Sequence, residues 1–424
     1  MQMQQKELEK QEAKESNQPK KPEIMKLTNE ILTNGLPPAF KQNNVPIVYN
    51  FSKGYVPPFT ICLKSAMRYY SPDKNYDIVI LTRELTDEQM GVIASMVEGH
   101  DNISVRYLNP APFFRGMKYF MADRLPLEGF FRSASPFILK QYDKLIYMDS
   151  DMLVKADLAE LYDTDVSGYY LAAVQDLVAK AFLNMKDKTA YAIDYIYRAK
   201  YRMRLRDPYT FFNSGLMLLN CAEIRRDFQW QDMMNFWKGV DFKCDDQDML
   251  NSLFQGHVKF LDLSWNLFAK TNEAFAKVYE EAPEMDYEAY LAAREHPKIV
   301  HFITEIKPWN VCQGDFVMEF WHLARNTPYY EALVEYVAGF LSQSVSSYCM
   351  YQMDYRSFDK RLKRSTWNIF KRGVNVILPL GTRRHEKVKE LYFRLTGKDY
   401  IAPFEIEEYE NKQATESDSL WGLE

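Results

Sequence analysis

The chain of 424 residues is poor in cysteine. Its five cysteines are scattered and odd in number, and none form a CxxC pair: Cys62, Cys221, Cys244, Cys312 and Cys349. This usage argues against a disulfide framework and against a zinc knuckle, because both need cysteines at paired spacings. It suits a protein of a reducing compartment.

Long apolar runs and an excess of basic charge are also missing. No apolar stretch approaches the roughly 20 residues that span a bilayer. The N-terminus is polar, unlike a signal peptide. The net charge is −5, so the chain as a whole shows no nucleic-acid-binding signature. We therefore expect a cytoplasmic protein that does not bind nucleic acid.

What the chain does contain is typical of a globular protein with a sizeable core. Hydrophobic residues make up 47% of it, and aromatic residues 15%, a high share. Extra Tyr and Phe suit sugar-binding or protein-binding surfaces, although an aromatic core accounts for most of them more simply. The length permits two or three domains, or one large domain with appendages.

Apolar runs alternate with segments of helical spacing along most of the chain. Residues 1–22 are rich in Gln, Glu and Lys, and we expect residues 1–44 to form a largely disordered or helical tail, with the ordered chain beginning near Pro46. Helices are predicted at 60–70, 86–97, 123–141 and 245–254, the second with a capping box from Thr86 to Gln89. Strands are predicted at 45–51, 76–82, 103–108, 144–148, 170–174, 211–219, 258–263 and 298–302. This alternation predicts an α/β fold with a doubly wound, mostly parallel sheet, in which ligands bind beyond the carboxyl ends of the strands.

Two segments depart from this rhythm. Residues 178–210 are rich in Lys, Arg, Tyr and Met, and we interpret them as a lid or an acceptor-binding insertion. After Trp309 the chain turns helical. We therefore divide it into a catalytic domain at 45–312 and a helical, basic extension at 313–424.

The strongest chemical feature is the pair Asp149 and Asp151, directly after the apolar run KLIYM. Alternate residues of an extended backbone face the same way, so the two carboxylates can share one cation. Carboxylate oxygens suit Mn²⁺ or Mg²⁺, and such a cation can neutralise a departing diphosphate. A solvated loop with two acids is the alternative, which the position at a strand end disfavours.

Three further groups stand out. His301 ends a predicted strand, and Lys307 follows six residues later, which suits a metal ligand and a phosphate contact, although a histidine there is often structural. The run 245–248 opens a helix, where Asp also serves as an N-cap, but it could recognise sugar hydroxyls with Gln247 near the reacting carbon. In 211–215, Asn-Ser-Gly interrupts an apolar run, where a small residue lets a ligand approach the backbone.

Together and in this order, these elements resemble the retaining glycosyltransferase family 8. That family includes bacterial lipooligosaccharide galactosyltransferases, cell-wall and lipopolysaccharide glucosyl- and galactosyltransferases, and glycogenin. The resemblance runs from about Val45 to Trp309. It rests on IVYNFSKGY, FRSASPFIL, DKLIYMDSDMLV, DLAELYDTD, LAAVQD, FFNSGLMLLN, DDQDMLN and HFITEIKPW. It implies a nucleotide-sugar transferase fold of the GT-A type.

The resemblance also implies roles for individual residues. Asp149, Asp151 and His301 match the family's metal ligands, and Lys307 matches its diphosphate contact. The positions that match donor-binding residues are Asn50, Tyr55, Arg132, Ser150, Asp176, Asn213, Asp246 and Gln247. Catalysis would rest on Gln247, Asp149, Asp151 and Lys307. The chain departs from the family pattern at Ser52, where an acid is common, and at Thr304, where a glycine is common, so base recognition and the phosphate loop could differ.

The implied reaction moves a hexose, galactose or glucose, from a UDP-sugar to a hydroxyl of a glycan, glycolipid or glycoprotein. Mn²⁺ or Mg²⁺ and Lys307 would stabilise the departing nucleoside diphosphate. Retaining glycosidases use a carboxylate nucleophile. Since the amide of Gln247 is a poor nucleophile, we favour attack of the acceptor on the face that the diphosphate leaves.

Two other classes of function, another enzyme activity or a binding role, are compatible with a carboxylate pair on this sheet. A nucleotidyltransferase or a nucleotide-sugar hydrolase would use the same metal. A non-catalytic nucleotide-sugar-binding partner of another transferase is a different class, and the presence of both aspartates, the histidine and the lysine argues against it.

Basic clusters alternate with Trp367, Ile369 and Phe370 in residues 356–389. A solvated helical tail that packs on the catalytic domain is one interpretation. A peripheral anchor at an anionic membrane surface is the other, because aromatic side chains settle at the headgroup boundary and Lys and Arg attract anionic lipids. A lipid-linked acceptor would give such an anchor a purpose.

Overall fold

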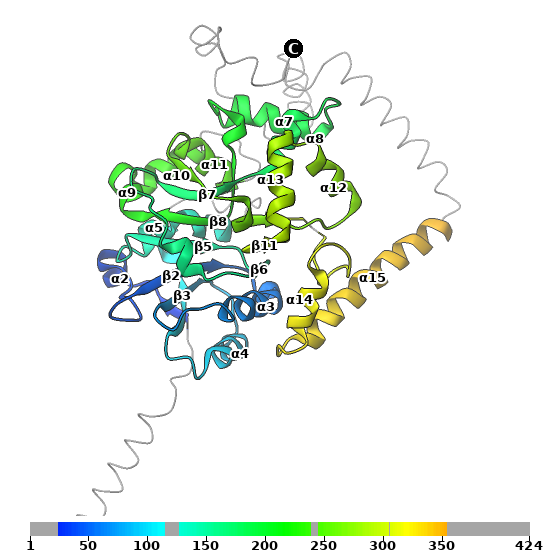
Figure 1. The fold of residues 1–424 in the computed structure, drawn as a ribbon. Helices are drawn as coiled ribbons and strands as arrows, with labels where there is room; N and C mark the ends of the chain where they lie inside the picture. Colours follow the sequence, from blue (N-terminus) through cyan, green and yellow to red (C-terminus); the bar gives the residue numbers. More distant parts are fainter. Residues whose placement is uncertain (1–23, 115–126, 239–244, 305, 354–424) are drawn as a thin grey trace, which may run out of the picture.

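The computed structural model describes residues 24–114, 127–238, 245–304 and 306–353. In these ranges a central eight-stranded sheet carries helices on both faces, and a small three-stranded sheet lies beside it (Figure 1). The order in the large sheet is β1-β4-β3-β2-β5-β8-β7-β9. Its strands are β1 (Ile24–Lys26), β2 (Asn44–Asn50), β3 (Asn75–Leu81), β4 (Ile103–Asn109), β5 (Lys144–Met148), β7 (Leu171–Gln175), β8 (Phe212–Asn220) and β9 (Val258–Phe260).

The sheet is mostly parallel, as the sequence predicts. Only β8 runs against its two neighbours, β5 and β7, while the other adjacent strands are parallel. The central strands are mostly apolar because both of their faces are covered. In β2, Ile47 and Tyr49 enter the core on one side of the sheet, and Val48 enters the core on the other. The expected α/β architecture is therefore present.

Helices cover the two faces of the large sheet. One face is covered by α3 (Val56–Met67), α4 (Asp87–Val97) and α6 (Leu158–Tyr162). The other is covered by α5 (Phe131–Ile138), α9 (Cys221–Asp227), α10 (Trp230–Lys238) and α11 (Asp245–Phe254). The predicted capping box of α4 is confirmed: the Thr86 hydroxyl accepts from the Gln89 amide, and the Gln89 side chain accepts from the Thr86 amide.

The small sheet determines the position of the candidate site. Its order is β10 (Leu267–Phe268), β11 (Ile299–His301) and β6 (Met152–Val154), with β6 and β11 antiparallel. The predicted strand at 298–302 therefore belongs to this second sheet, next to the strand that follows Asp151. The helices α12 (Glu273–Glu280) and α13 (Glu284–Glu295) pack with it in a separate apolar cluster.

The expectation that the ordered chain begins near Pro46 is wrong. β1 pairs in parallel with β4 and extends the large sheet, and α2 (Asn29–Asn34) follows it. Leu27 and Leu36 are buried in the core. The mostly apolar segment 24–27 is too short to be recognised as a strand from the sequence. It forms an edge strand only because it pairs with β4, about 80 residues later in the chain.

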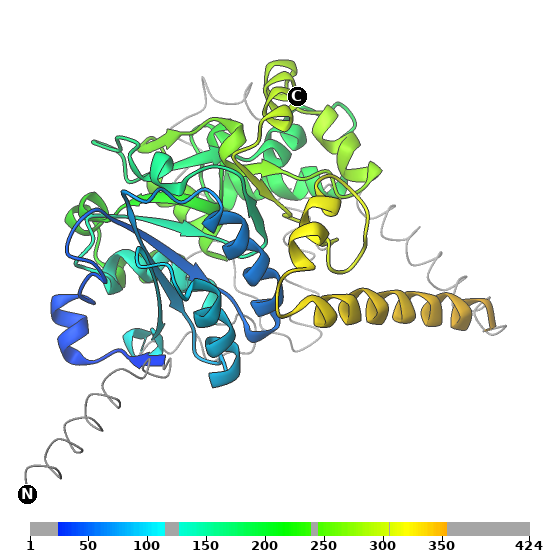
Figure 2. The same ribbon diagram turned by 60° about the horizontal axis from the view of Figure 1, so that its bottom comes forward.

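The segment at 178–210 folds as a small helical unit. It contains α7 (Leu177–Asn184), α8 (Ala190–Tyr197) and a π-helical turn at Arg198–Arg202, which share an apolar cluster of their own. The helices α14 (Val317–Ala324) and α15 (Tyr330–Met353) end the described chain, and α15 extends away from the rest of the molecule (Figure 2). Residues 356–389 lie outside the described residues. Among the helices that are described, none is long and apolar enough to span a bilayer.

Candidate active site

The two aspartates of the predicted motif lie in the link between the two sheets. β5 ends at Met148, and β6 begins at Met152. The backbone amide of Asp149 donates to the Gly215 carbonyl of β8 (2.7 Å), and the Tyr147 hydroxyl donates to Asp149 Oδ1 (2.9 Å). Ser150, between the aspartates, is buried. The link is thus attached to the large sheet at Asp149 and to the small sheet just after Asp151.

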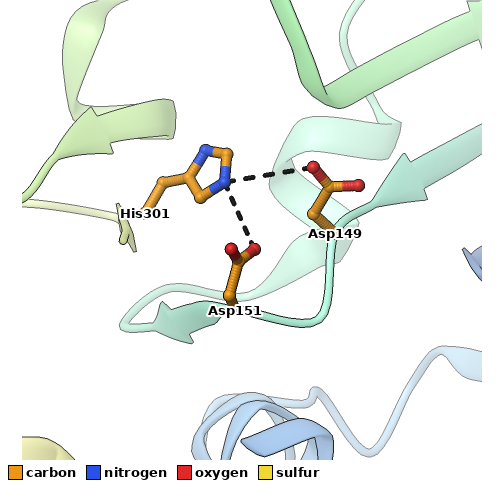
Figure 3. A group of neighbouring side chains, drawn as sticks. All are labelled: Asp149, Asp151 and His301. Carbon is orange, nitrogen blue, oxygen red and sulfur yellow. Dashed lines mark ion pairs between the residues drawn. The ribbon is translucent and has the colours of Figure 1, made fainter. Parts of the chain in front are cut away.

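His301 reaches the aspartates through the pairing of β11 with β6. In this register His301 lies opposite Met152, and the amide of Phe302 donates to the Asp151 carbonyl (3.1 Å). His301 Nε2 lies 3.3 Å from Asp151 Oδ1 and 4.0 Å from Asp149 Oδ2 (Figure 3). One ligand atom from each of the three side chains lies within 4.8 Å of the others. Residues about 150 positions apart along the chain therefore converge on one point.

The other imidazole nitrogen is engaged by a residue that the sequence did not single out. His301 Nδ1 lies 3.0 Å from Asn266 Oδ1, and both residues are buried. Asn266 Nδ2 in turn donates to Asn213 Oδ1 (3.0 Å), so the amide oxygen of Asn266 is the atom that faces the histidine. Nδ1 then carries the proton that Asn266 accepts, so Nε2 is the nitrogen left to bind a cation between the aspartates. A metal-binding histidine needs this tautomer when the cation is bound.

Gly215 keeps space open beside the three side chains. A Cβ added there would lie 2.9 Å from Asp149 Oδ2 and 2.9 Å from Asn213 Oδ1, and it would also collide with His301 Cε1. A side chain at position 215 would therefore displace Asp149, Asn213 and His301. Two carboxylates, an imidazole of the correct tautomer and a glycine that leaves room fit a divalent cation of the Mn²⁺ or Mg²⁺ type.

Burial and neighbouring charges move the two carboxyl groups in opposite directions. Burial raises the pKa of Asp149, and the attraction of Arg132 offsets only part of that effect. Burial also opposes ionisation of Asp151, but His301 and Lys307 together hold the pKa of Asp151 well below its usual value. Asp151 is thus the carboxyl group that ionises more readily.

Lys307 is drawn into the same centre. Its Nζ donates to Asp151 Oδ2 (2.5 Å) and to the backbone carbonyl of Phe302, and the residue is buried. A buried ammonium group at this point offers a positive charge next to the carboxylates. Such a charge suits an anionic group that shares a cation with them.

Arg132 of α5 forms the opposite side of the site. Its Nε pairs with Asp246 Oδ2 (2.6 Å), and its Nη1 donates to Ser214 Oγ (2.9 Å) and lies 3.7 Å from Asp149 Oδ1. Burial alone would lower the pKa of Arg132, but the surrounding carboxylates raise it above its ordinary value. The guanidinium group therefore stays charged, and it joins α5, β8 and α11 beside the aspartates.

Gln247 lies on α11 and faces β8. Its Oε1 accepts from the Ser214 amide (2.9 Å) and from the Ser214 hydroxyl (3.1 Å). Because a backbone N–H can only donate, the oxygen must be the atom that faces Ser214, so the NH₂ group is left for other partners. Ser214, which the sequence showed only as part of a polar interruption, therefore contacts both Arg132 and Gln247.

The side chains of Asp176 and Asn213 contact each other, and Asn213 links this pair to Asn266. Asp176 is the N-cap of α7 and accepts from the Ala179 amide (3.0 Å). Burial raises the pKa of Asp176, while backbone amides and the Asn213 side chain lower it. Asn213 also accepts from Asn266. The capping role of Asp176 is therefore established here, and its donor-binding role stays a prediction.

A pocket of about 590 Å³ opens next to Lys307. Tyr55 lines it, as do Ser52 and Thr304, the two positions where the sequence departs from the family pattern. Asn50 is not among the lining residues. It ends β2 and donates to the Glu128 carbonyl (2.5 Å). Of the predicted donor-binding residues Asn50 and Tyr55, only Tyr55 lines the pocket beside Lys307.

Residues 46–312 match the sequence profile described as Glycosyl transferase family 8. The match covers more than half of the chain and includes every residue of the site above. The chain belongs to this family. It is 29% identical over 187 residues to General stress protein A of Bacillus subtilis, in a match that covers 43% of this chain and 58% of that protein.

Two solved structures share the fold. The bifunctional glycosyltransferase WbbM is 27% identical, with a TM-score of 0.63 over 71% of this chain and 53% of its own. The galactosyltransferase LgtC, solved with donor and acceptor sugar analogues, is 22% identical, with a TM-score of 0.53 over 67% of this chain and 96% of its own. The fold is therefore of the GT-A type. The chain spans only somewhat more than half the length of the Bacillus protein and of WbbM.

Proposed function

We propose that this chain is a metal-dependent, retaining glycosyltransferase that moves a hexose from a UDP-sugar to a hydroxyl group. The observation that carries the proposal is the convergence of Asp149, Asp151 and His301 beside the buried ammonium group of Lys307. Carboxylates and an imidazole bind a divalent cation, and a nearby ammonium group binds an anion. A diphosphate that is shared between a cation and a lysine satisfies both.

The three side chains would hold Mn²⁺ or Mg²⁺. When it is bound, such a cation acts as a Lewis acid that neutralises the charge on the departing diphosphate. Lys307 adds its own positive charge to the same oxygens. Asn266 keeps His301 in the metal-binding tautomer, and Tyr147 holds Asp149 by a hydrogen bond.

Gln247 is suited to recognise the transferred sugar, not to attack it. Its oxygen accepts two hydrogen bonds from Ser214, which leaves the NH₂ group as the donor for a sugar hydroxyl or ring oxygen. An amide so engaged is a poor nucleophile. We therefore favour attack by the acceptor hydroxyl on the face that the diphosphate leaves, so that configuration is retained without a covalent enzyme intermediate. Arg132, Asp176, Asn213 and Asp246 complete the proposed donor site, with Ser150 in the metal-binding link.

The choice of a UDP-hexose is supported by relatives and by the pocket. The galactosyltransferase LgtC, which shares the fold, was solved in complex with donor and acceptor sugar analogues. The pocket beside Lys307 has the size of a small-molecule site, roughly 300–1,000 Å³, and carries Tyr55, which suits a nucleobase. The acceptor would be a hydroxyl of a glycan, glycolipid or glycoprotein.

A donor screen tests the proposal. The full chain would be incubated with UDP-galactose, UDP-glucose and their N-acetylated counterparts in Mn²⁺, and nucleotide release would be measured. We expect release from a UDP-hexose, with water as a slow acceptor when no other is supplied. Release of free sugar that an added acceptor does not convert to a glycoside would instead indicate a nucleotide-sugar hydrolase, as would release of a nucleoside monophosphate. Binding of a UDP-sugar without any turnover would indicate a non-catalytic partner.

The basic residues at 356–389 support a second part of the proposal, a peripheral contact with the inner face of the membrane. Sedimentation with anionic and with neutral vesicles, at low and at high salt, tests it. We expect binding to anionic vesicles that high salt removes, since the attraction is electrostatic. Equal binding to both vesicle types would leave this segment as a structural element.

A further inference from the structure

The pocket beside Lys307 has one wall that comes from outside the segment matched by the family. Its lining residues include Gly54 and Tyr55 from the loop after β2, and Lys307 and Trp309 from the segment after β11. Tyr336 lines it from the helix α15. The family match ends at residue 312, so Tyr336 lies outside the segment that the family profile matches.

The first turns of α15 are fixed to the domain. Leu333 is fully buried in the apolar cluster that also contains Trp309 and Phe320. Tyr336 follows three residues later, so it lies on the same face of the helix as Leu333. Figure 1 shows this end of α15 beside α14 and near α3. The pocket wall at Tyr336 is therefore anchored, although the far end of the helix extends away from the domain.

Tyr336 also contacts the loop after β2 directly. Its hydroxyl donates to the Gly54 carbonyl (3.4 Å), in the turn Lys53–Tyr55. The same turn also contacts α4, because the Gln89 side chain donates to the Lys53 carbonyl (3.1 Å). The turn that carries Tyr55 is thus hydrogen-bonded to both α4 and α15.

The lining of the pocket combines two kinds of group. Lys307, which contacts Asp151, supplies a positive charge. Tyr55, Trp309 and Tyr336 supply aromatic rings, with Tyr55 and Trp309 packed edge to face at 5.8 Å between centroids. A ligand that satisfies both kinds of group carries an anionic part and a flat, polar aromatic part. A nucleoside diphosphate has this composition.

We infer that Tyr336 of α15 is a donor-binding residue that forms the outer wall of the nucleoside site. The inference rests on the proposed function, since it takes the diphosphate to lie between the metal ligands and Lys307. The nucleoside then extends into the aromatic part of the pocket. Nucleobases stack on aromatic side chains, and the loss of one such contact weakens binding about tenfold or more.

The test compares two ligands that share phosphate groups and differ in the nucleoside. Calorimetric titrations of the full chain in Mn²⁺ would use UDP and inorganic pyrophosphate. Tyr336→Ala should weaken UDP binding about tenfold and leave pyrophosphate binding unchanged. Tyr336→Phe keeps the ring and removes only the hydrogen bond to Gly54, so it should lie close to the wild type.

Two further variants control for effects on the fold. Tyr336→Gln keeps a long side chain and good helix propensity without a ring, and it should reproduce the selective loss of UDP binding. Val334→Ala changes an exposed position on the same helix that does not line the pocket, and both ligands should bind to it as to the wild type.

The outcomes separate the inference from the proposed function. If the wild type binds neither ligand, the proposed function fails, and the inference fails with it. If the wild type binds both, the proposed diphosphate site stands, and the variants decide on Tyr336. Unchanged UDP binding in Tyr336→Ala would overturn the inference, as would an equal loss for UDP and pyrophosphate, which indicates a general effect of α15 on the fold.

Discussion

The side-chain amide of Asn266 accepts a buried hydrogen bond of 3.0 Å from Nδ1 of His301 and so determines which imidazole nitrogen faces Asp151. The amide is itself oriented by its hydrogen bond to Asn213. Metal affinity should therefore depend on a residue that would not touch the metal. Mutation of a residue that hydrogen-bonds to a metal ligand commonly weakens metal affinity about 10- to 100-fold.

Asn266→Ala should raise the Mn²⁺ concentration needed for half-maximal transfer by at least about tenfold, because His301 loses its tautomeric preference and its orientation. The measurement is activity against Mn²⁺ concentration. Asn272→Ala is the matched control: Asn272 caps α12, and its loss should cost about 1 kcal/mol of stability without moving the Mn²⁺ midpoint. Equal midpoints for Asn266→Ala and the wild type would contradict the assigned role.

Gly215→Ala should abolish transfer while the protein still folds. The new methyl group would lie 2.9 Å from Asp149 Oδ2 and would displace His301. The measurement pairs activity with thermal unfolding. Gly91→Ala serves as the control, since a Cβ there has no neighbour within 4 Å and lies in the interior of α4. It should keep full activity and gain about 1 kcal/mol of stability, because Ala favours a helix over Gly.

Gln247→Ala should lower kcat more than it raises the donor KM, because we place its NH₂ group at the reacting centre of the sugar. Steady-state kinetics with the UDP-hexose found in the donor screen measures both parameters. Gln231→Ala, an exposed position on α10, should change neither. A raised KM with an unchanged kcat would mean that Gln247 only binds donor.

The sequence predicts the strands and the helix α4 around this site well, because short stretches of neighbouring residues determine them. The strands β2, β3 and β5 are mostly apolar runs, and Asp149 and Asp151 follow one of them directly. The capping box of α4 is likewise a signal within four residues. The convergence of His301 with the aspartates was expected from the family resemblance, and the antiparallel pairing of β6 with β11 accounts for it physically.

What the sequence does not reveal depends on contacts between distant segments. Asn266 stands 35 positions before His301 and looks like an ordinary turn residue. Ser214 contacts Arg132 and Gln247 only because α5, β8 and α11 pack together. β1 is too short to be recognised without β4 beside it. The division into tail, catalytic domain and extension stays a prediction, as do the individual roles of the donor-binding residues.

The measurement that tests the central claim most directly is nucleotide release from the UDP-hexose by the wild type and by Asp151→Asn, first in a chelator and then after Mn²⁺ is added back. Asp151 lies 3.3 Å from His301 Nε2 and 2.5 Å from Lys307 Nζ, so the change to an amide removes the charge that both groups face. We expect the wild type to lose activity in the chelator and to regain it with Mn²⁺, and Asp151→Asn to remain folded and inactive throughout. Full activity of the wild type in the chelator, or of Asp151→Asn in Mn²⁺, would contradict the account.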